Sequence, residues 1–143
     1  NARVLNTKKY KSGWTSAISP VDFALGWGQQ LSTEKYDEYI KFSQSGRWYY
    51  FKYEADCPLS EKEIQYNSSN HHIIPATDNI WKAVLTVKKN DLIYMQGYLV
   101  RVEANTEHGL SEWVSSLTRK DSGDRSCEVF YVDMIQIEDR VYR

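Results

Sequence analysis

The stretch LIYMQGYLVRVE, residues 92–103, decides the fold of this chain. It follows a polar turn at 88–91, and apolar residues occupy both of its alternating sets of positions. Two further β-patterned runs, WVSSLT at 113–118 and CEVFYVDMIQI at 127–137, follow loops rich in charge, Gly and Ser. Three such runs with short connections predict an antiparallel meander. A strand that is apolar on both faces predicts enclosure in a sandwich or closed barrel.

The region before this stretch predicts a hairpin and several helices. Residues 40–43 and 47–53 flank the turn Gln44-Ser45-Gly46, and aromatic residues on both sides of the second run again favour enclosure. The clearest helix signal lies at 77–87, where apolar residues recur on one face. Shorter helices are predicted from Ser19-Pro20 to the glycines 26 and 28, at 32–39, and after the capping box Ser60–Glu63.

The order of these elements predicts an α+β fold that is mainly β. It fits a small antiparallel barrel of the oligonucleotide/oligosaccharide-binding (OB) type, with one main helix near 77–87 and short helices. An α+β roll fits equally well. Because no repeat, linker or low-complexity tract interrupts residues 1–143, the chain is predicted to be one globular domain.

Composition narrows the classes of function. The net charge is −1 and the pI about 6.3, so the whole chain lacks the basic footprint of a nucleic-acid-binding protein. The sequence has 5 Trp and 11 Tyr, which indicate either a core built on rings or an aromatic binding surface. Asn1-Ala2 reads as the remnant of a cleaved tag, which predicts that an N-terminal signal or anchor was removed and that any membrane contact was made through it.

Three polar clusters are candidates for chemistry. The first is NSSNHH at 67–72, interpreted as a loop, whose adjacent histidines do not match the spacing of a metal site. The second is SSLTRKDSG at 115–123, where Arg119 is expected to pair with Asp121 or Asp124 in a turn. The third, Cys127-Glu128, could join His71 or His72 in nucleophilic catalysis. Neither a metal nor a cofactor is predicted.

The two cysteines, Cys57 and Cys127, are too few for a disulfide framework or a four-ligand zinc site. Two buried thiols, one bridge in an oxidising compartment, or one reactive thiol remain open.

Five segments, PVDFALGWG, SQSGRWYYFKY, NHHIIPA, GYLV and SSLTRKDSGDRSCE, occur in this order and span nearly the whole chain. Together they resemble a family of uncharacterised bacterial proteins, a domain of unknown function. The resemblance implies an N-terminal hydrophobic segment before the domain, and hence a periplasmic or membrane-anchored location in the cell envelope, but it implies no mechanism. Its polar positions are Ser45, Arg47, Asn70, His72, Ser115, Ser116, Arg119, Asp121, Cys127 and Glu128.

Three functional hypotheses follow. The first is a non-catalytic envelope domain that binds a protein partner or a small polar ligand through a β surface. The second is a small hydrolase or transferase that uses His72 with Ser115 or Cys127, with Arg119 holding an anion. The third is a nucleic-acid-binding barrel with a basic face of Arg47, Lys52, Arg101 and Arg119, which the near-neutral charge disfavours.

Overall fold

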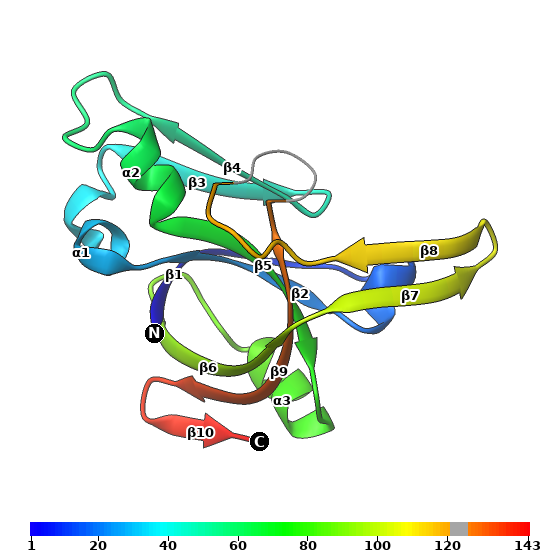
Figure 1. Cartoon of the computed structure of the whole chain (residues 1–143). Helices are drawn as coiled ribbons and strands as arrows, with labels where there is room; N and C mark the ends of the chain where they lie inside the picture. Colours follow the sequence, from blue (N-terminus) through cyan, green and yellow to red (C-terminus); the bar gives the residue numbers. More distant parts are fainter. Residues whose placement is uncertain (121–125) are drawn as a thin grey trace.

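A closed five-stranded barrel forms the centre of the molecule in the computed structural model, which describes residues 1–120 and 126–143 (Figure 1). Its strands are β1 (Ala2–Lys9), β2 (Val21–Gly26), β5 (Ser68–Pro75), β6 (Leu92–Leu99) and β9 (Glu128–Ile137). β1 pairs with β2, β2 with β5, β5 with β9, and β9 with β6. Two residue pairs, Ala2–Ile93 and Arg3–Leu92, join β6 back to β1 and close the ring.

The connectivity of the barrel is that of the OB type. Numbered along the chain, the strands run first, second, third, fifth and fourth around the ring, and the third and fifth are parallel. Helix α3 (Asp78–Val84) connects the third strand to the fourth and packs on β5 and β9. The predicted small α+β barrel with one main helix is therefore confirmed. α3 ends before residue 87, because Leu85 and Thr86 close it with a turn.

Apolar side chains from all five strands and α3 fill the barrel. They include Val4, Val21, Phe23, Ile73, Ile80, Val84, Ile93, Val132 and Ile135. Gly97 allows β6 to bend at a bulge, where a Cβ would lie 1.8 Å from the Tyr131 carbonyl oxygen. Burial of this core is the main source of stability, as expected for a mixed β protein.

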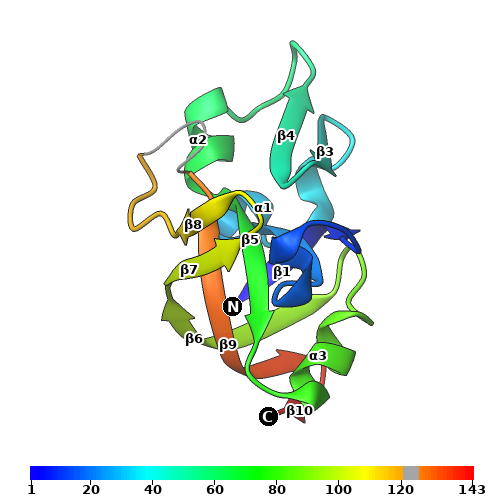
Figure 2. The ribbon, with the colours of Figure 1, turned by 90° about the vertical axis from the view of Figure 1, so that its right-hand side faces the viewer.

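A long insertion between β2 and β5 covers part of the outside of the barrel (Figure 2). It contains α1 (Gly28–Leu31), the 3₁₀ helix η2 (Glu34–Tyr36), the hairpin of β3 (Ile40–Ser45) and β4 (Trp48–Tyr53), and α2 (Glu61–Tyr66). A second apolar core holds it against β1 and β2, and this core contains Leu5, Ala24, Leu31, Ile40, Leu59 and Ile64. The predicted hairpin and the capping box of Ser60 and Glu63 are both present.

The remaining elements decorate the other sides of the barrel. The 3₁₀ helix η1 (Trp14–Ala17) lies between β1 and β2, and β10 (Arg140–Tyr142) pairs with the end of β9. β7 (Arg101–Thr106) and β8 (Gly109–Val114) form a two-stranded ribbon that projects from the barrel (Figure 1). No helix in the described residues is long and apolar enough to span a membrane.

Two local predictions are wrong for the same reason. Residues 19–28 contain strand β2 rather than a helix, and the polar stretch 67–72 belongs largely to strand β5 rather than to a loop. Cap residues and polar composition are local signals, whereas both segments lie side by side in the barrel wall, where burial determines their conformation. The helix predicted at 32–39 is reduced to the single turn η2.

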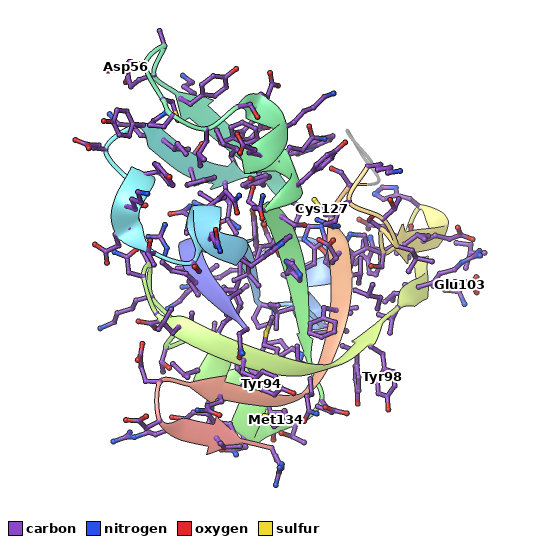
Figure 3. All side chains as sticks on the ribbon, turned by 60° about the vertical axis from the view of Figure 1, so that its left-hand side comes forward. Asp56, Tyr94, Tyr98, Glu103, Cys127 and Met134 are labelled. Carbon is purple, nitrogen blue, oxygen red and sulfur yellow. The ribbon has the colours of Figure 1, made fainter. Side chains whose placement is uncertain are left out.

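The predicted meander and two-sided enclosure of residues 92–103 are also incorrect. β6 pairs with β9, and the ribbon β7–β8 separates them in the chain, so the three runs are not consecutive neighbours. The run 113–118 is a strand only as far as Val114. β6 exposes one side to solvent, and Tyr98, 65% exposed, points away from the barrel (Figure 3). In the closed barrel β6 is hydrogen-bonded to a neighbouring strand on each edge, but its outer face stays exposed.

Candidate functional site

A buried ion pair lies on the outer side of β2, where the insertion and the β7–β8 ribbon meet the barrel. The Asp22 carboxylate is fully buried, and the Arg47 guanidinium lies 2.6 Å from it. Arg47 follows Gly46 at the turn between β3 and β4 with a φ of 70°. This left-handed turn directs the Arg47 side chain back toward β2, where it also donates to the Ser19 carbonyl oxygen at 2.7 Å. The Arg47 guanidinium stacks 4.0 Å above the ring of Tyr10.

The neighbouring strand β5 adds His72 and Asn70 to this pair. His72 lies directly across from Asp22, and its Nδ1 is 2.9 Å from Asp22 Oδ2, although the angle is not that of a hydrogen bond. The His72 ring lies 4.5 Å from the ring of Trp113. Asn70 accepts a hydrogen bond from Gln44 at 2.7 Å and donates to the Arg47 carbonyl oxygen at 3.3 Å. We call Asp22, Arg47, Asn70 and His72 the Asp22 cluster.

In OB barrels the second and third strands carry the ligand-binding face. Here these strands are β2 and β5, and the Asp22 cluster occupies their outer side. The hairpin contributes Arg47 and Gln44 to it, and β8 contributes Trp113. The chain itself therefore covers the part of this face around Asp22 and His72.

A second polar cluster faces the end of the barrel interior. The Glu128 carboxylate contacts the Arg119 guanidinium and the Ser69 hydroxyl. The Nδ1 atom of His71 lies 3.8 Å from Glu128. Burial, followed by the charge of Arg119, lowers the pKa of His71 to about 3, so the ring is neutral near pH 7. A neutral imidazole does not form a true ion pair with Glu128, and Arg119 is the cation that balances this carboxylate.

The predicted nucleophiles are engaged in other contacts. Ser115 Oγ donates to the Ser116 carbonyl oxygen at 2.9 Å and accepts from the Val129 amide at 3.0 Å. Ser116 Oγ donates to the Thr118 carbonyl oxygen at 2.8 Å. Both cysteines are free and half-buried, and burial raises the pKa of the Cys127 thiol. The Cys127 sulfur lies 3.8 Å from the side-chain nitrogen of Asn70 and lines a cavity of about 250 Å³ beside Arg119.

The candidates predicted from sequence thus divide into several groups. Arg47, Asn70 and His72 meet at the Asp22 cluster, with Cys127 beside Asn70, and Arg119 and Glu128 meet at the barrel end. Ser45 is exposed on the hairpin. Ser115 and Ser116 form hydrogen bonds with backbone groups of the segment that follows β8. Asp121, and the predicted pairing of Arg119 with Asp121 or Asp124, lie outside the described residues. Sequence reasoning missed Asp22, whose only signal is a single carboxylate in the otherwise apolar run VDFALG.

The four residues proposed as a basic face do not present four uncompensated charges. Arg47 is paired with Asp22, Arg101 with Glu103 and Glu112, and Arg119 with Glu128. Within the described residues, no group of three or more His, Cys, Asp and Glu side chains is arranged to hold a metal ion.

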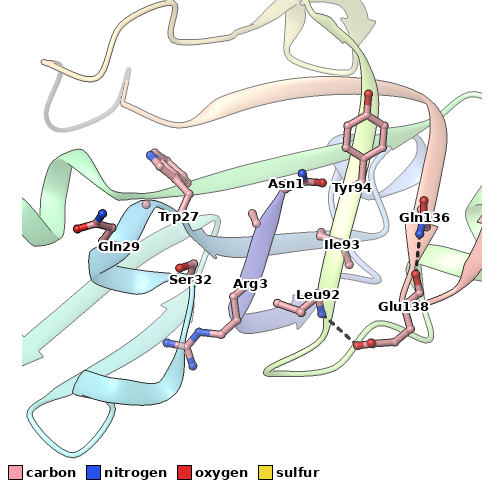
Figure 4. Close-up of a pocket in the computed structure, with 12 residues that line it drawn as sticks. Asn1, Arg3, Trp27, Gln29, Ser32, Leu92, Ile93, Tyr94, Gln136 and Glu138 are labelled. Carbon is pink, nitrogen blue, oxygen red and sulfur yellow. Dashed lines mark hydrogen bonds between the residues drawn. The ribbon is translucent and has the colours of Figure 1, made fainter.

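An open groove of about 820 Å³ lies where β1 and β6 close the barrel (Figure 4). Trp27 and Tyr94 stand on its two sides, and Leu92 and Ile93 form part of its floor. Its polar side chains include Gln29, Ser32, Gln136 and Glu138. We call this feature, defined by these eight residues, the seam groove.

The two charged side chains that line the seam groove differ in their contacts. Arg3 binds the Asp37 carboxylate at 2.7 Å and 2.8 Å and donates to the Leu31 carbonyl oxygen at 3.1 Å. Glu138 accepts from the Leu92 amide at 3.1 Å (Figure 4). The groove therefore offers two aromatic rings, several uncharged hydrogen-bonding groups and the Glu138 carboxylate. Comparison of the chain with protein-family models, curated proteins and solved structures found no match.

Proposed function

We propose that the protein is a non-catalytic binding domain whose ligand site is the seam groove. The observation that carries the proposal is the pairing of Trp27 and Tyr94 across an open groove in which Arg3 is bound to Asp37. The Glu138 carboxylate, which accepts only the Leu92 amide within the described residues, disfavours an anionic ligand. Aromatic side chains with a few convergent polar groups are typical of ligand sites. The rings suit a ligand with a flat apolar face, and the amide and hydroxyl groups suit one with many uncharged polar groups. A neutral oligosaccharide has both properties.

The binding role is supported by the contacts of the polar residues that a catalytic role would need. Ser115 Oγ is engaged with two backbone groups, and His72 lies against Asp22 and Trp113. A raised pKa keeps the Cys127 thiol protonated near pH 7, which disfavours its use as a nucleophile. These residues support the architecture of the barrel wall. The resemblance described above supports a location at the bacterial cell envelope, which fractionation of bacterial cells that produce the protein would test.

Titration of ¹⁵N-labelled protein with neutral tetrasaccharides tests the proposed site. Cellotetraose, maltotetraose and chitotetraose at millimolar concentrations provide three different linkages and substituents. At least one of them is expected to shift the indole N–H signal of Trp27 and to be recovered intact. Tyr94→Ala should weaken that binding about tenfold, the loss of about 1.4 kcal/mol of contact with one ring. Tyr98→Ala is the matched control, because Tyr98 is an exposed tyrosine of the same strand outside the groove.

Two results would overturn this function. The groove is rejected if none of the three tetrasaccharides moves the Trp27 signal, or if Tyr94→Ala binds as tightly as Tyr98→Ala. The non-catalytic role is rejected if the protein hydrolyses an activated ester such as p-nitrophenyl acetate and His72→Gln abolishes the activity. The second result would favour the alternative hydrolase in which His72 acts with Ser115 or Cys127.

A further inference from the structure

The outer face of the β3–β4 hairpin carries two aromatic residues that the fold does not use. The two strands alternate, so Phe42, Tyr49 and Phe51 pack toward the second apolar core. Trp48 and Tyr50 point the opposite way and are 41% and 48% exposed. Within the described part of the chain, the rings of Trp48 and Tyr50 contact no other ring. The Trp48 indole N–H and the Tyr50 hydroxyl make no hydrogen bond there.

The residues opposite these rings leave them accessible. Ser45 pairs with Trp48 and Ser43 pairs with Tyr50, and both serines are exposed. A serine is too small to cover the ring opposite it, and its hydroxyl can donate or accept a hydrogen bond. Residues two apart on a strand share a face and are separated by about 7 Å. Trp48 and Tyr50 thus form a short row of rings edged by hydroxyl groups.

Two lysines complete this face at the end away from the turn. Lys41 and Lys52 are directly opposite each other and both are exposed. Like charges at opposite positions destabilise a strand pair. Within the described ranges, neither lysine has an acidic partner. A negatively charged group bound between them would relieve this repulsion.

We propose that Ser43, Ser45, Trp48, Tyr50, Lys41 and Lys52 form a binding face for an acidic oligosaccharide. Sugar rings would lie against Trp48 and Tyr50, their hydroxyls would meet the serines, and a carboxylate would lie between the lysines. This site goes beyond the function proposed above, because it lies on the inserted hairpin and shares no residue with the seam groove.

The distribution of charge favours an acidic sugar over single-stranded nucleic acid. A nucleic acid carries a phosphate at every residue and needs a track of cations. Here both lysines lie at one end of the face, and Arg47 at the turn is paired with Asp22. Glu54 and Asp56 follow β4 in the chain and would repel a polyanion that continued in that direction.

The test titrates ¹⁵N-labelled protein with two sugars whose carboxylates are isolated, a hyaluronan tetrasaccharide and sialyllactose. Galactotetraose serves as the uncharged probe and an oligothymidylate as the nucleic-acid probe. We expect at least one acidic sugar to shift the indole signal of Trp48 and to leave that of Trp27 unchanged. Trp48→Ala should weaken this binding about tenfold or more. The double change Lys41→Gln and Lys52→Gln should remove the preference for the acidic over the uncharged sugar.

Tyr66→Ala is the matched control, because Tyr66 is a 43% exposed ring on α2 outside this face. It should bind the acidic sugar as the parent protein does. All substituted side chains are exposed, and the dispersion of the amide spectrum reports folding of each variant. The proposal is overturned if neither acidic sugar moves the Trp48 signal, if Trp48→Ala binds normally, or if the oligothymidylate binds this face more tightly than both sugars. Movement of the Trp27 signal by neutral sugars tests the seam groove separately.

Discussion

Arg47, at the tip of an inserted hairpin, forms a 2.6 Å ion pair with Asp22, which is fully buried in the wall of the barrel. The pair joins two parts of the chain that pack through different apolar cores. It thereby fixes the position of the hairpin over β2 and β5.

Asp22→Asn should destabilise the protein by about 3 kcal/mol, because it leaves the mostly buried Arg47 cation without a counter-charge. Urea denaturation measures the free energy of unfolding. The control is Glu103→Gln, which removes an ion pair whose two side chains are both more than half exposed. Its effect should stay below about 1 kcal/mol. Equal effects of the two changes would contradict a structural role for the Asp22 cluster.

His71 should make stability depend on pH. Its pKa is lowered to about 3 in the folded protein, whereas an unfolded histidine titrates near 6.5. Between these values the unfolded chain binds the extra proton. The contribution of His71 to the free energy of unfolding is therefore fully present above pH 6.5. It is lost as the pH falls, by at most about 1.4 kcal/mol per pH unit.

The measurement is the free energy of unfolding of the parent protein and of His71→Gln from pH 7.5 to pH 4.5. The parent should lose stability more steeply than the variant over this range. His108→Gln is the control, because His108 is an exposed residue in the turn of the β7–β8 ribbon. Parallel curves for the parent and His71→Gln would show that His71 titrates normally in the folded state.

The Cys127 thiol should react slowly with alkylating agents. Burial raises its pKa, and only the thiolate attacks such reagents. In a Cys57→Ser background, where Cys127 is the single thiol, alkylation by iodoacetamide at pH 7.5 should be at least about tenfold slower in the folded protein than in urea. Mass spectrometry follows the reaction. A faster reaction in the folded protein would instead identify an activated cysteine and favour the catalytic alternative.

Much of the barrel could be predicted from patterns that reflect burial in the final structure. The β6 and β9 runs and the helix near 80 are each continuous in sequence and lie in the core. The β3–β4 turn and the cap at Ser60 depend on neighbouring residues alone, so local chemistry was sufficient to predict them. The position of β6 relative to β9 depends on the intervening ribbon, which no local pattern specifies.

The candidate site was predictable only in part. Arg47, Asn70 and His72 are polar positions of the segments that carry the resemblance, but Asp22, the residue that unites them, lies in a segment whose sequence predicts a helix start. Once that segment is a strand, the register of β2 with β5 places Asp22 opposite His72. Trp27 and Tyr94 come from distant segments that meet only when the barrel closes, so their groove had no signature in the sequence.

The insertion also changes where a search for ligands should begin. In this chain the tip of the β3–β4 hairpin and the end of β8 occupy part of the surface on which OB barrels bind their ligands. A ligand placed by analogy with another OB barrel would therefore overlap Arg47 and Trp113. Unbiased mapping of ligand binding over the whole exterior is therefore the more informative first experiment.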